Sequence, residues 1–339
     1  MTFQPKKLLV TGGAGFIGSN FIHYWQKHHP DHFIVNLDVM TYAGNLQNLA
    51  GLPHLSQYLF VEGDIRNGHL VEQLLRGHHI DTIVHFAAES HVDRSIAHPD
   101  VFVQTNVIGT YTLLEAARKV WLDEKKWTAA DCRFHHISTD EVYGSLGLDD
   151  PAFTEVSQYQ PNSPYSASKA GSDHLVRAYH HTFGLPTTLS NCSNNFGPRQ
   201  HPEKLIPTII RHCMQWSPIP VYGDGNNVRD WLYVEDHCEA IERILYQGVI
   251  GQAYNVGGKN EWSNLDLVEL ICNIFDRLHP QSKGYDSLIS FVKDRPGHDY
   301  RYAINPEKIS TELGWSVTHH FEDQLKNMIL ICLEEVDAI

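Results

Sequence analysis

The first half of the chain alternates short apolar runs with longer segments in which apolar residues recur every three or four positions. This alternation of strand and helix patterns is typical of a parallel sheet covered by helices. The short runs predict strands at residues 7–11, 33–38, 58–62, 82–87, 133–138 and 187–193. The longer segments predict helices at residues 16–27, 69–76, 101–120 and 164–183. The predicted fold class is therefore α/β, with a doubly wound parallel sheet.

A second, smaller lobe is expected after residue 195. From Phe196 onward prolines become frequent, at positions 198, 202, 207, 218 and 220, and Gly223-Asp224-Gly225 marks a turn. Residues 232–234 and 253–256 are predicted as strands that return to the main sheet, and residues 263–277 and 306–313 as helices. We therefore expect a sheet domain at 1–195, with returning segments near 231–257, and an interleaved C-terminal lobe at 196–230 and 258–339.

The charge of the chain argues against a nucleic-acid partner. The sequence holds 40 Asp and Glu residues against 26 Lys and Arg residues, a formal net charge of -14. This excess repels polyphosphate backbones. A small anionic ligand stays possible, because it needs only a few local cations and backbone N–H groups.

Cysteine, histidine and the N-terminal residues carry no signal for a metal or a membrane. The six cysteines are scattered without a C-x-x-C pair, which suits reduced thiols. The 23 histidines include pairs such as His28-His29 in polar segments, without the i, i+4 spacing of a helical metal site. No apolar run reaches the ~18 residues of a membrane span, and no leader pattern opens the chain. We expect a cytoplasmic protein without a metal.

A glycine-rich turn joins the first expected strand to the first expected helix. Gly12, Gly15 and Gly18 form a G-x-x-G-x-x-G pattern in that position. Glycine lets the backbone approach a pyrophosphate, whose charge then lies at the helix N-terminus. Asp38 ends the second strand, where a carboxylate accepts hydrogen bonds from ribose hydroxyls and repels a 2'-phosphate. The pattern favours NAD over NADP. Asp64-Ile65 could flank the adenine or form an ordinary turn.

Tyr165 and Lys169 lie four residues apart at the start of an expected helix, so their side chains share one face. A free tyrosine titrates near ~10, and a nearby ammonium is expected to lower that pKa. Tyr165 could then take a proton from a hydroxyl while a hydride leaves the same carbon. Such a pair could arise by chance among 15 tyrosines, and the glycine-rich turn favours the catalytic interpretation.

Thr139, Asp140 and Glu141 follow the expected strand at 133–138, at the sheet edge where open α/β folds bind ligands. The Thr139 hydroxyl could share the substrate proton with Tyr165. Two adjacent carboxylates at a strand end are often a solvated turn or a helix cap. Beside a hydride-transfer site they could instead form an acid/base pair whose pKa values are split by mutual repulsion.

Further motifs follow one another along nearly the whole chain. They are TGGAGFIGSN from Thr11, TYAGN from Thr41, FAAESHVDRSI from Phe86, HISTDEVYG from His136, SPYSASKA from Ser163, NCSNNFGP from Asn191, PEKLIP from Pro202, VYGDGNNVRDWLYVEDH from Val221, YNVGG from Tyr254 and DRPGHDYRYAI from Asp294. In this order they resemble the extended short-chain dehydrogenase/reductase family and, within it, the dTDP-glucose 4,6-dehydratases. The resemblance implies a Rossmann-type sheet of the extended kind.

The resemblance also implies roles for particular residues. The catalytic positions are Thr139, Asp140, Glu141, Tyr165 and Lys169. Contacts with a tightly bound NAD are expected from Gly12, Gly15, Phe16, Ile17, Gly18, Asp38, Thr41, Asp64, Ile65, Ala87, Asn106, Tyr165 and Lys169. Contacts with the nucleotide sugar dTDP-glucose are expected from Ser90, Thr139, Asn195, Lys204, Leu205, Pro220, Tyr222, Arg229, Asn264, Arg295 and His298. Arg229 and Arg295 suit a diphosphate, although surface salt bridges are the alternative.

The reaction implied has three steps. Tyr165, helped by Lys169 and Thr139, takes the 4-hydroxyl proton as the C4 hydride passes to NAD. Glu141 takes the C5 proton while Asp140 protonates the departing 6-hydroxyl. The hydride then returns to C6, which gives a 4-keto-6-deoxy sugar nucleotide. A dehydratase for UDP-glucose, a nucleotide-sugar 4-epimerase and a non-catalytic relative are the alternatives.

The chain departs from the family pattern at three places. Val39-Met40 replaces the usual Lys-Leu, which leaves one contact near the cofactor open, and the segment 145–160 is shorter than in many relatives, so we expect a trimmed loop over the active site. Phe196 stands where tyrosine is common and Arg199 is added, which leaves the nucleotide base or sugar open.

A homodimer is also expected. The helices at 101–120 and 164–183 carry apolar residues beyond the needs of one sheet face, and in the family these helices pair across a two-fold axis. These apolar residues are Val103, Val107, Tyr111, Val176 and Tyr179.

Overall fold

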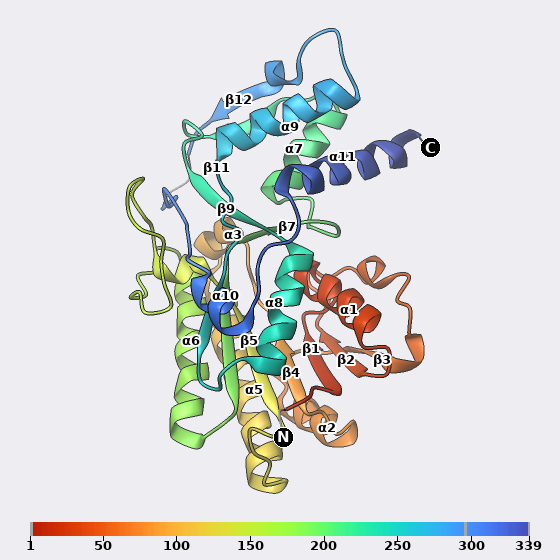
Figure 1. Ribbon diagram of the computed structural model, residues 1–339, viewed down its shortest axis with the longest axis vertical. Coiled ribbons are helices and arrows are strands. Elements are labelled where there is room, and N and C mark those ends of the chain that lie inside the picture. The colour runs from red at the N-terminus through yellow and green to blue at the C-terminus, as the bar shows by residue number, and fades with distance from the viewer. Residues whose placement is uncertain (1–2, 295–296, 338–339) are drawn as a thin grey trace.

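A seven-stranded parallel sheet organises the larger part of the chain (Figure 1). The structure is a computed structural model that describes residues 3–294 and 297–337. The strand order is β10-β6-β5-β4-β1-β2-β3, and all neighbouring pairs are parallel. The strands are β1 Lys7–Thr11, β2 Phe33–Asp38, β3 Tyr58–Glu62, β4 Thr82–His85, β5 Arg133–Thr139, β6 Thr187–Cys192 and β10 Ala253–Val256. The predicted doubly wound α/β sheet is confirmed.

Helices cover both faces of this sheet because successive strand residues point to opposite sides. Leu8 and Val10 of β1 pack toward α1 and α8, whereas Leu9 packs toward α2, α5 and α6. The helices are α1 Phe16–His28 and α8 Val234–Gln247 on one face, and α2 Gly68–Gly77, α5 Thr110–Ala117 and α6 Pro164–Phe183 on the other. Strand order reverses between β1 and β4, so the loops that follow β1, β4 and β5 meet at one edge.

The helix expected at residues 101–120 is longer and less regular than predicted. It continues from α4 (Pro99–Phe102) through α5, with π-helical turns at Val103–Gly109 and Arg118–Glu124. Such turns change which side chains a helix directs inward, and they recur at functional sites. Short elements complete this part: α3 Val92–Ala97 and the 3₁₀ turns Leu46–Leu49, Leu55–Gln57 and Asp140–Tyr143.

The smaller lobe packs above the carboxyl edge of the main sheet, in the upper part of Figure 1. It contains a three-stranded sheet, β11-β9-β7, and a two-stranded sheet, β12-β8. Its elements are β7 Asn194–Phe196, α7 Leu205–Met214, β8 Ile219–Tyr222, β9 Val228–Tyr233, β11 Glu261–Ser263, α9 Asn264–Leu278, a 3₁₀ turn Tyr285–Leu288, β12 Ile289–Val292 and α11 Phe321–Asp337. Apolar side chains of α7, α9 and α11 form its core.

One strand prediction in this lobe was wrong. Residues expected as a returning strand at 232–234 belong to β9 of the small sheet, and Val234 begins α8. The second expected return is confirmed, since β10 pairs with β6 at the sheet edge. Helix α10 (Glu307–Leu313) packs on β10 and α8 through Ile309 and Leu313. The division into two domains stays a prediction. The contacts of α10 with β10 and α8 favour assigning this helix to the domain of the seven-stranded sheet.

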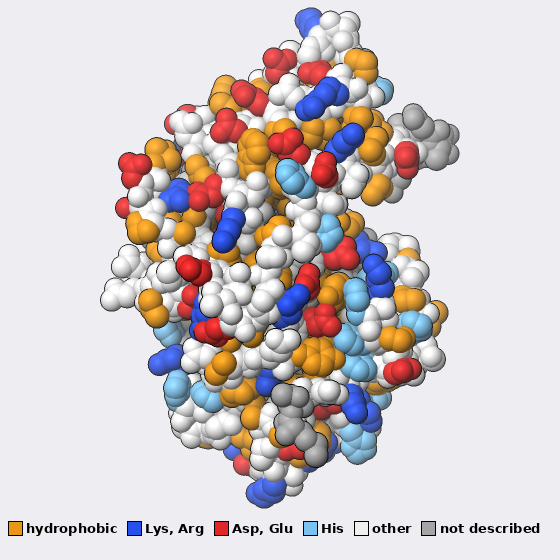
Figure 2. All heavy atoms as spheres, in the orientation of Figure 1, with side chains coloured by type: hydrophobic (Ala, Val, Ile, Leu, Met, Phe, Trp, Pro, Cys, Tyr) orange, Lys and Arg blue, Asp and Glu red, His pale blue; other side chains and the backbone are white. Residues whose placement is uncertain are grey.

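The surface carries mixed charge on the face drawn in Figure 2, where Asp and Glu side chains are interspersed with Lys, Arg and His. Within the described residues, no helix combines the length and apolar character that crossing a bilayer requires.

Candidate active site

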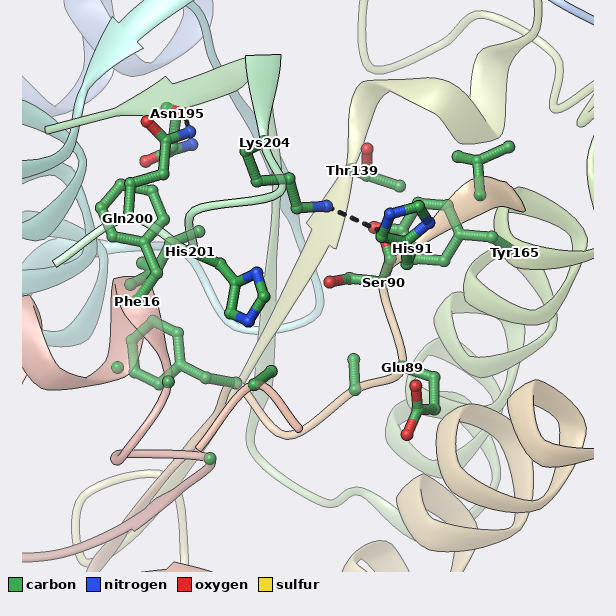
Figure 3. Close-up of a pocket in the computed structure, with 18 of the residues that line it drawn as sticks. Phe16, Glu89, Ser90, His91, Thr139, Tyr165, Asn195, Gln200, His201 and Lys204 are labelled. Carbon is green, nitrogen blue, oxygen red and sulfur yellow. Dashed lines mark hydrogen bonds between the residues drawn. The ribbon is translucent and has the colours of Figure 1, made fainter. Parts of the chain in front are cut away.

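A cavity of about 1060 Å³ lies where the carboxyl ends of β1, β4 and β5 face the smaller lobe. Among the described residues, every one expected to react or to bind a ligand lines it, apart from Asn106. Arg295 lies outside the described residues. In Figure 3 the side chains of Phe16, Thr139, Tyr165 and Lys204 approach this space from different elements. The cavity therefore gathers residues from Gly12 to Tyr302, nearly three hundred positions apart in the sequence.

The glycine-rich turn is shaped by contacts that leave no room for a side chain. Gly12 has a φ of +72°, and a Cβ there would lie 2.6 Å from the backbone nitrogen of Ala87. A Cβ on Gly18 would lie 2.4 Å from the carbonyl oxygen of Gly12. The turn therefore packs tightly against the end of β4 and leaves the N-terminus of α1 open to the cavity, where unpaired N–H groups suit a diphosphate.

Asp38 is fixed at the other side of this turn. Its carboxylate accepts hydrogen bonds from the backbone N–H of Ala14 and of Met40, each 2.9 Å long. A carboxylate has further lone pairs, and Asp38 lines the cavity, so it can also accept from ribose hydroxyls. The N-terminus of α1 suits the diphosphate of a dinucleotide, and the Asp38 carboxylate at the end of β2 suits its ribose. Together they fit a dinucleotide such as NAD.

Two other predicted cofactor residues have structural partners. The carboxylate of Asp64 lies 2.6 Å from the guanidinium of Arg66, and Asp64 also lines the cavity. The ordinary turn and the adenine contact predicted for Asp64-Ile65 are therefore both supported. Asn106 lies behind the cavity wall. Its side-chain amide accepts from the N–H of Glu89 and donates to the Glu89 carbonyl and to Ser168. Asn106 thereby ties the loop after β4 to α6.

Asp140 is buried, and only one of its carboxyl oxygens has a partner. The Thr139 hydroxyl donates to Oδ1 at 3.3 Å, whereas Oδ2 has no hydrogen-bond partner in the structure. Thr139 also caps the turn Asp140–Tyr143 by accepting from the N–H of Glu141. Burial, and then the nearby charges of Glu141 and Asp230, raise the Asp140 pKa well above its ordinary value. Burial therefore shifts Asp140 toward its protonated form, in a turn that is capped but not solvated.

Tyr165 and Lys169 occupy the first turns of α6, which begins with a capping box between Ser163 and Ser166. The Lys169 ammonium donates to the carbonyl of Ile137 at 2.7 Å. Burial, and then the charge of Glu141, raise the Tyr165 pKa well above its ordinary value. Burial also lowers the Lys169 pKa to about 8.

The expectation that Lys169 lowers the Tyr165 pKa was therefore wrong for this cavity. Desolvation disfavours the phenolate, and Lys169 is engaged by a carbonyl group of β5. The Thr139 hydroxyl is the group that favours the phenolate here, through a hydrogen bond to Tyr165. A cation bound beside the phenol would add to that effect.

Sequence reasoning missed Asp173, which lies beneath the Tyr165–Lys169 pair on α6. Its carboxylate accepts from Ser138 at 2.8 Å and from Tyr159 at 3.0 Å. Burial raises the Asp173 pKa to about 6, and its charge raises the pKa of Lys169 against the effect of burial. The i, i+4, i+8 spacing of the three residues on one helix was the available signal.

Sequence reasoning also missed a group of interactions at the rim of the cavity. The guanidinium of Arg94 lies 3.5 Å from the ring centroid of Tyr42. Glu203 approaches Arg94 at 3.4 Å and His91 at 3.8 Å. These side chains join the segments after β2 and β4 to the loop before α7. We call Tyr42, His91, Arg94 and Glu203 the rim cluster.

The substrate side of the cavity is built mainly by the smaller lobe. Arg229 is buried, donates to the carbonyls of Val228 and Asp299, and lies 4.4 Å from the centroid of the Tyr302 ring. It is not a surface salt bridge. Figure 3 shows Lys204 extending to the loop after β4, where its ammonium donates to the carbonyl of Ser90 at 3.2 Å. Two cations thus reach this half of the cavity.

Two of the departures from the family pattern, Val39 and Arg199, line the cavity. Arg199 lines the cavity with a φ of 67° and donates to the side chain of Asn20 on α1. Phe196 is buried against Phe321 and Tyr233. No group of three His, Cys, Asp or Glu side chains converges as a metal site in the described part of the chain.

A doubly wound sheet with a glycine-rich turn, a Tyr-x-x-x-Lys pair and a second lobe over the same cavity defines an extended short-chain dehydrogenase/reductase. Residues 9–328 match the family model described as GDP-mannose 4,6 dehydratase. The chain is 54% identical over 93% of its length to a dTDP-glucose 4,6-dehydratase of Xanthomonas campestris pv. campestris (strain B100), of which it covers 89%. It is 50% identical to the enzyme of that name from Haemophilus influenzae, with 95% of this chain and 96% of the relative covered.

Solved structures agree with this relationship. DesIV, a dTDP-glucose 4,6-dehydratase from Streptomyces venezuelae with NAD bound, superposes with a TM-score of 0.87 at 45% identity, and 97% of each chain is covered. The chain belongs to the dTDP-glucose 4,6-dehydratase family of extended short-chain dehydrogenases/reductases. The family resemblance predicted from the sequence motifs is confirmed.

Replacing Gly18 by alanine tests the glycine-rich turn. Because the added Cβ would meet the Gly12 carbonyl at 2.4 Å, the turn must shift, and we expect NAD affinity to fall at least about tenfold, or 1.4 kcal/mol. Gly77→Ala is the matched control, since a Cβ there meets nothing within 4 Å. Calorimetric titration with NAD and a thermal unfolding midpoint for each variant provide the measurement. Equal NAD affinity in the two variants would contradict the packing argument.

Asp173→Asn tests the charge beneath Lys169. The Asp173 carboxylate raises the pKa of Lys169, so its loss should move that pKa further below about 8. The ammonium is then lost at lower pH, and we expect the alkaline fall of kcat/KM to move down by about one pH unit. Asp100→Asn, at an exposed site, is the control. A pH profile that overlies that of the control would remove Asp173 from the electrostatics of the site.

Proposed function

We propose that this chain dehydrates dTDP-glucose to dTDP-4-keto-6-deoxyglucose with NAD held in the cavity. The observation that carries the proposal is a buried Asp140 beside the Tyr165–Lys169 pair, whose Oδ2 has no hydrogen-bond partner and whose pKa burial raises well above its ordinary value. Oxidation of an alcohol alone needs no such acid. Loss of water needs a proton donor for the leaving hydroxyl.

NAD fits the half of the cavity formed by the glycine-rich turn and Asp38. When bound there, NAD would supply the acceptor for the C4 hydride and the donor that returns it to C6. Tyr165 takes the proton of the 4-hydroxyl, and Thr139 hydrogen bonds to the phenol oxygen. The Lys169 ammonium donates to the carbonyl of Ile137. It supplies a positive charge four residues from Tyr165, on the same face of the helix.

Elimination follows from the ketone at C4, which acidifies the C5 hydrogen. Glu141 takes the C5 proton, and Asp140 protonates the 6-hydroxyl as water leaves. Glu141 then returns its proton to C5. The smaller lobe binds the nucleotide diphosphate, for which the buried guanidinium of Arg229 and the ammonium of Lys204 supply positive charge. The names of the relatives support dTDP-glucose over UDP-glucose.

An epimerase is the nearest competitor. A UDP-glucuronic acid 4-epimerase of Bacillus cereus shares the fold with a TM-score of 0.83 at 29% identity. Epimerisation at C4 uses a base and a hydride acceptor and needs no acid for a 6-hydroxyl. Asp140 is the residue that favours dehydration.

We also propose that the chain forms a homodimer through the helical face of residues 99–124. Val101, Val103, Ile108 and Tyr111 each expose about two fifths or more of their surface there. Exposed apolar side chains close together in sequence on one helical segment favour a partner surface. Val176 and Tyr179, which were expected to contribute, are instead buried in the core of the subunit. The six cysteines, scattered without a C-x-x-C pair, favour a cytoplasmic location.

Glu141→Gln tests the assignment of the C5 base. We expect C4 oxidation to continue, visible as the absorbance of reduced cofactor, while solvent deuterium no longer enters C5. Asp140→Asn is the contrasting variant: deuterium should still enter C5, whereas water loss should fall at least about a hundredfold. The wild-type protein should convert dTDP-glucose to a 4-keto product faster than it converts UDP-glucose. Absence of any 4-keto product from dTDP-glucose would refute the proposed function.

Tyr111→Glu tests the dimer. A charge in the centre of an apolar contact is costly, so we expect the variant to elute as a monomer where the wild type is a dimer. Leu55→Glu, which places the same charge at an exposed position elsewhere, should leave the assembly unchanged. Sedimentation or light scattering gives the mass of each species. A monomeric wild type, or a dimeric Tyr111→Glu variant, would count against this interface.

A further inference from the structure

The segment of residues 299–302 leads from the smaller lobe toward α10 and passes the start of α6 (Figure 1). The side-chain amide of Asn162 donates to Oδ1 of Asp299 at 2.7 Å. Asn162 directly precedes Ser163, which is the N-cap of α6, and α6 carries Tyr165 in its first turn. The Asp299 carboxylate is therefore tied to the helix that bears the proposed base.

The same segment holds the arginine that we propose for the diphosphate. The backbone carbonyl of Asp299 accepts from Nη2 of Arg229 at 3.0 Å. Nη1 of Arg229 donates to the carbonyls of Val228 at 2.7 Å and of Tyr300 at 3.4 Å. Arg229 is 6% exposed and lines the cavity. The place of its guanidinium in the cavity therefore depends on where residues 299 and 300 lie.

Tyr302 links the Asp299 carboxylate to the same guanidinium. Its hydroxyl donates to Oδ2 of Asp299, and the centroid of its ring lies 4.4 Å from the guanidinium carbon of Arg229. Burial, and then the charges of Glu141 and Asp299, raise the Tyr302 pKa well above its ordinary value, so the hydroxyl keeps the proton that it donates. Both oxygens of the Asp299 carboxylate thus accept a hydrogen bond, and the residue is only 8% exposed. A buried carboxylate with both oxygens satisfied is held in a fixed position.

We propose that Asp299 is a positioning residue that fixes Arg229 relative to Tyr165, a role that rests on the proposed function. Bound dTDP-glucose has to meet two groups at once, Arg229 with its diphosphate and Tyr165 with its 4-hydroxyl. Arg229 belongs to β9 and Tyr165 to α6, so the distance between these two elements decides where the sugar lies. Asp299 contacts α6 through its N-cap region and Arg229 through its own carbonyl and Tyr302. An oriented reaction is slowed strongly by a small error in such a placement.

Backbone contacts hold the segment independently of the Asp299 side chain. The N–H of Val228 donates to the carbonyl of Tyr300 at 2.8 Å, and the N–H of Tyr302 donates to the carbonyl of Val228 at 3.2 Å. The N–H of Leu146 donates to the carbonyl of Arg301 at 3.0 Å. Variants that change only the Asn162–Asp299 contact are therefore expected to fold.

Asn162→Asp tests the tie between Asp299 and α6. The change places a second carboxylate against Asp299, and the two like charges repel. In the NAD-loaded protein we expect the affinity for dTDP, the nucleotide part of the proposed substrate, to fall at least about tenfold. The KM for dTDP-glucose should rise and kcat should fall with it. The affinity for NAD should stay at the wild-type value, because the glycine-rich turn and Asp38 form the cofactor half of the cavity. Calorimetric titration measures the two affinities, and a thermal unfolding midpoint checks the fold.

The double variant Asn162→Asp with Asp299→Asn is the matched control. It exchanges the amide and the carboxylate, so the new amide at position 299 can donate to the new carboxylate at position 162 and accept from Tyr302. We expect dTDP affinity, KM and kcat to return to the wild-type values.

Three results would overturn the positioning role. They are wild-type dTDP affinity in Asn162→Asp, a double variant as impaired as the single one, and an equal loss of NAD affinity. If Asn162→Asp does not fold, Asp299→Ala takes its place, and Asp299→Asn is its control because the Asn162 amide can turn to accept from the new amide. A wild-type protein that neither binds dTDP nor forms a 4-keto product would instead refute the proposed function, and the role of Asp299 with it.

Discussion

Removal of ionisable groups from water at the carboxyl end of β5 is the constraint on which this site depends. Asp140, Tyr165, Lys169 and Asp173 are all buried there. Each carries a pKa displaced toward its neutral form, because burial penalises charge. In water Asp140 would be ionised at pH 7 and could not donate a proton. The fold raises the pKa of Asp140 by burying it, which favours the protonated form that can donate.

The sheet provides this enclosure. All seven residues of β5 are buried, between helices on both faces and between β4 and β6 at its sides. Its last residue, Thr139, and the turn that follows line the cavity. Helix α6 brings Tyr165 and Lys169 against the same strand end, with the carbonyl of Ile137 as the anchor for the ammonium. Acid, base and hydroxyl therefore come from two rigid elements whose relative position is set by the core.

The sequence was enough to predict the sheet and the residues around its carboxyl edge, because strand and helix periods there are strong and the motifs follow strand ends. It was not enough for quantities that depend on packing. The spacing of Tyr165 and Lys169 is visible in the sequence, but the depth of their burial is not, so the direction of the Tyr165 pKa was predicted wrongly. Asn106 was predicted at the cofactor, whereas the π-helical turn around it directs its amide to Glu89 and Ser168.

The smaller lobe was harder to predict for a related reason. Its helices α7 and α11 were not predicted, and β9 was assigned to the wrong sheet. The strands of that lobe are three to six residues long and are defined by pairing with strands far along the chain, as β11 pairs with β9. Local patterns carry little information about such pairing.

The rim cluster joins separate segments at the edge of a cavity from which water has to be kept during the reaction. A ketone with an acidic neighbouring carbon and an alkene beside it must be protected until C5 and C6 are protonated and reduced. Arg94 packs on Tyr42 and pairs with Glu203, so the segments after β2 and β4 are held to the loop that leads into the smaller lobe. A reaction that restores its cofactor in each turnover has no need to release it. The contacts of Arg94 with Tyr42 and Glu203 therefore need not break to release a cofactor between turnovers.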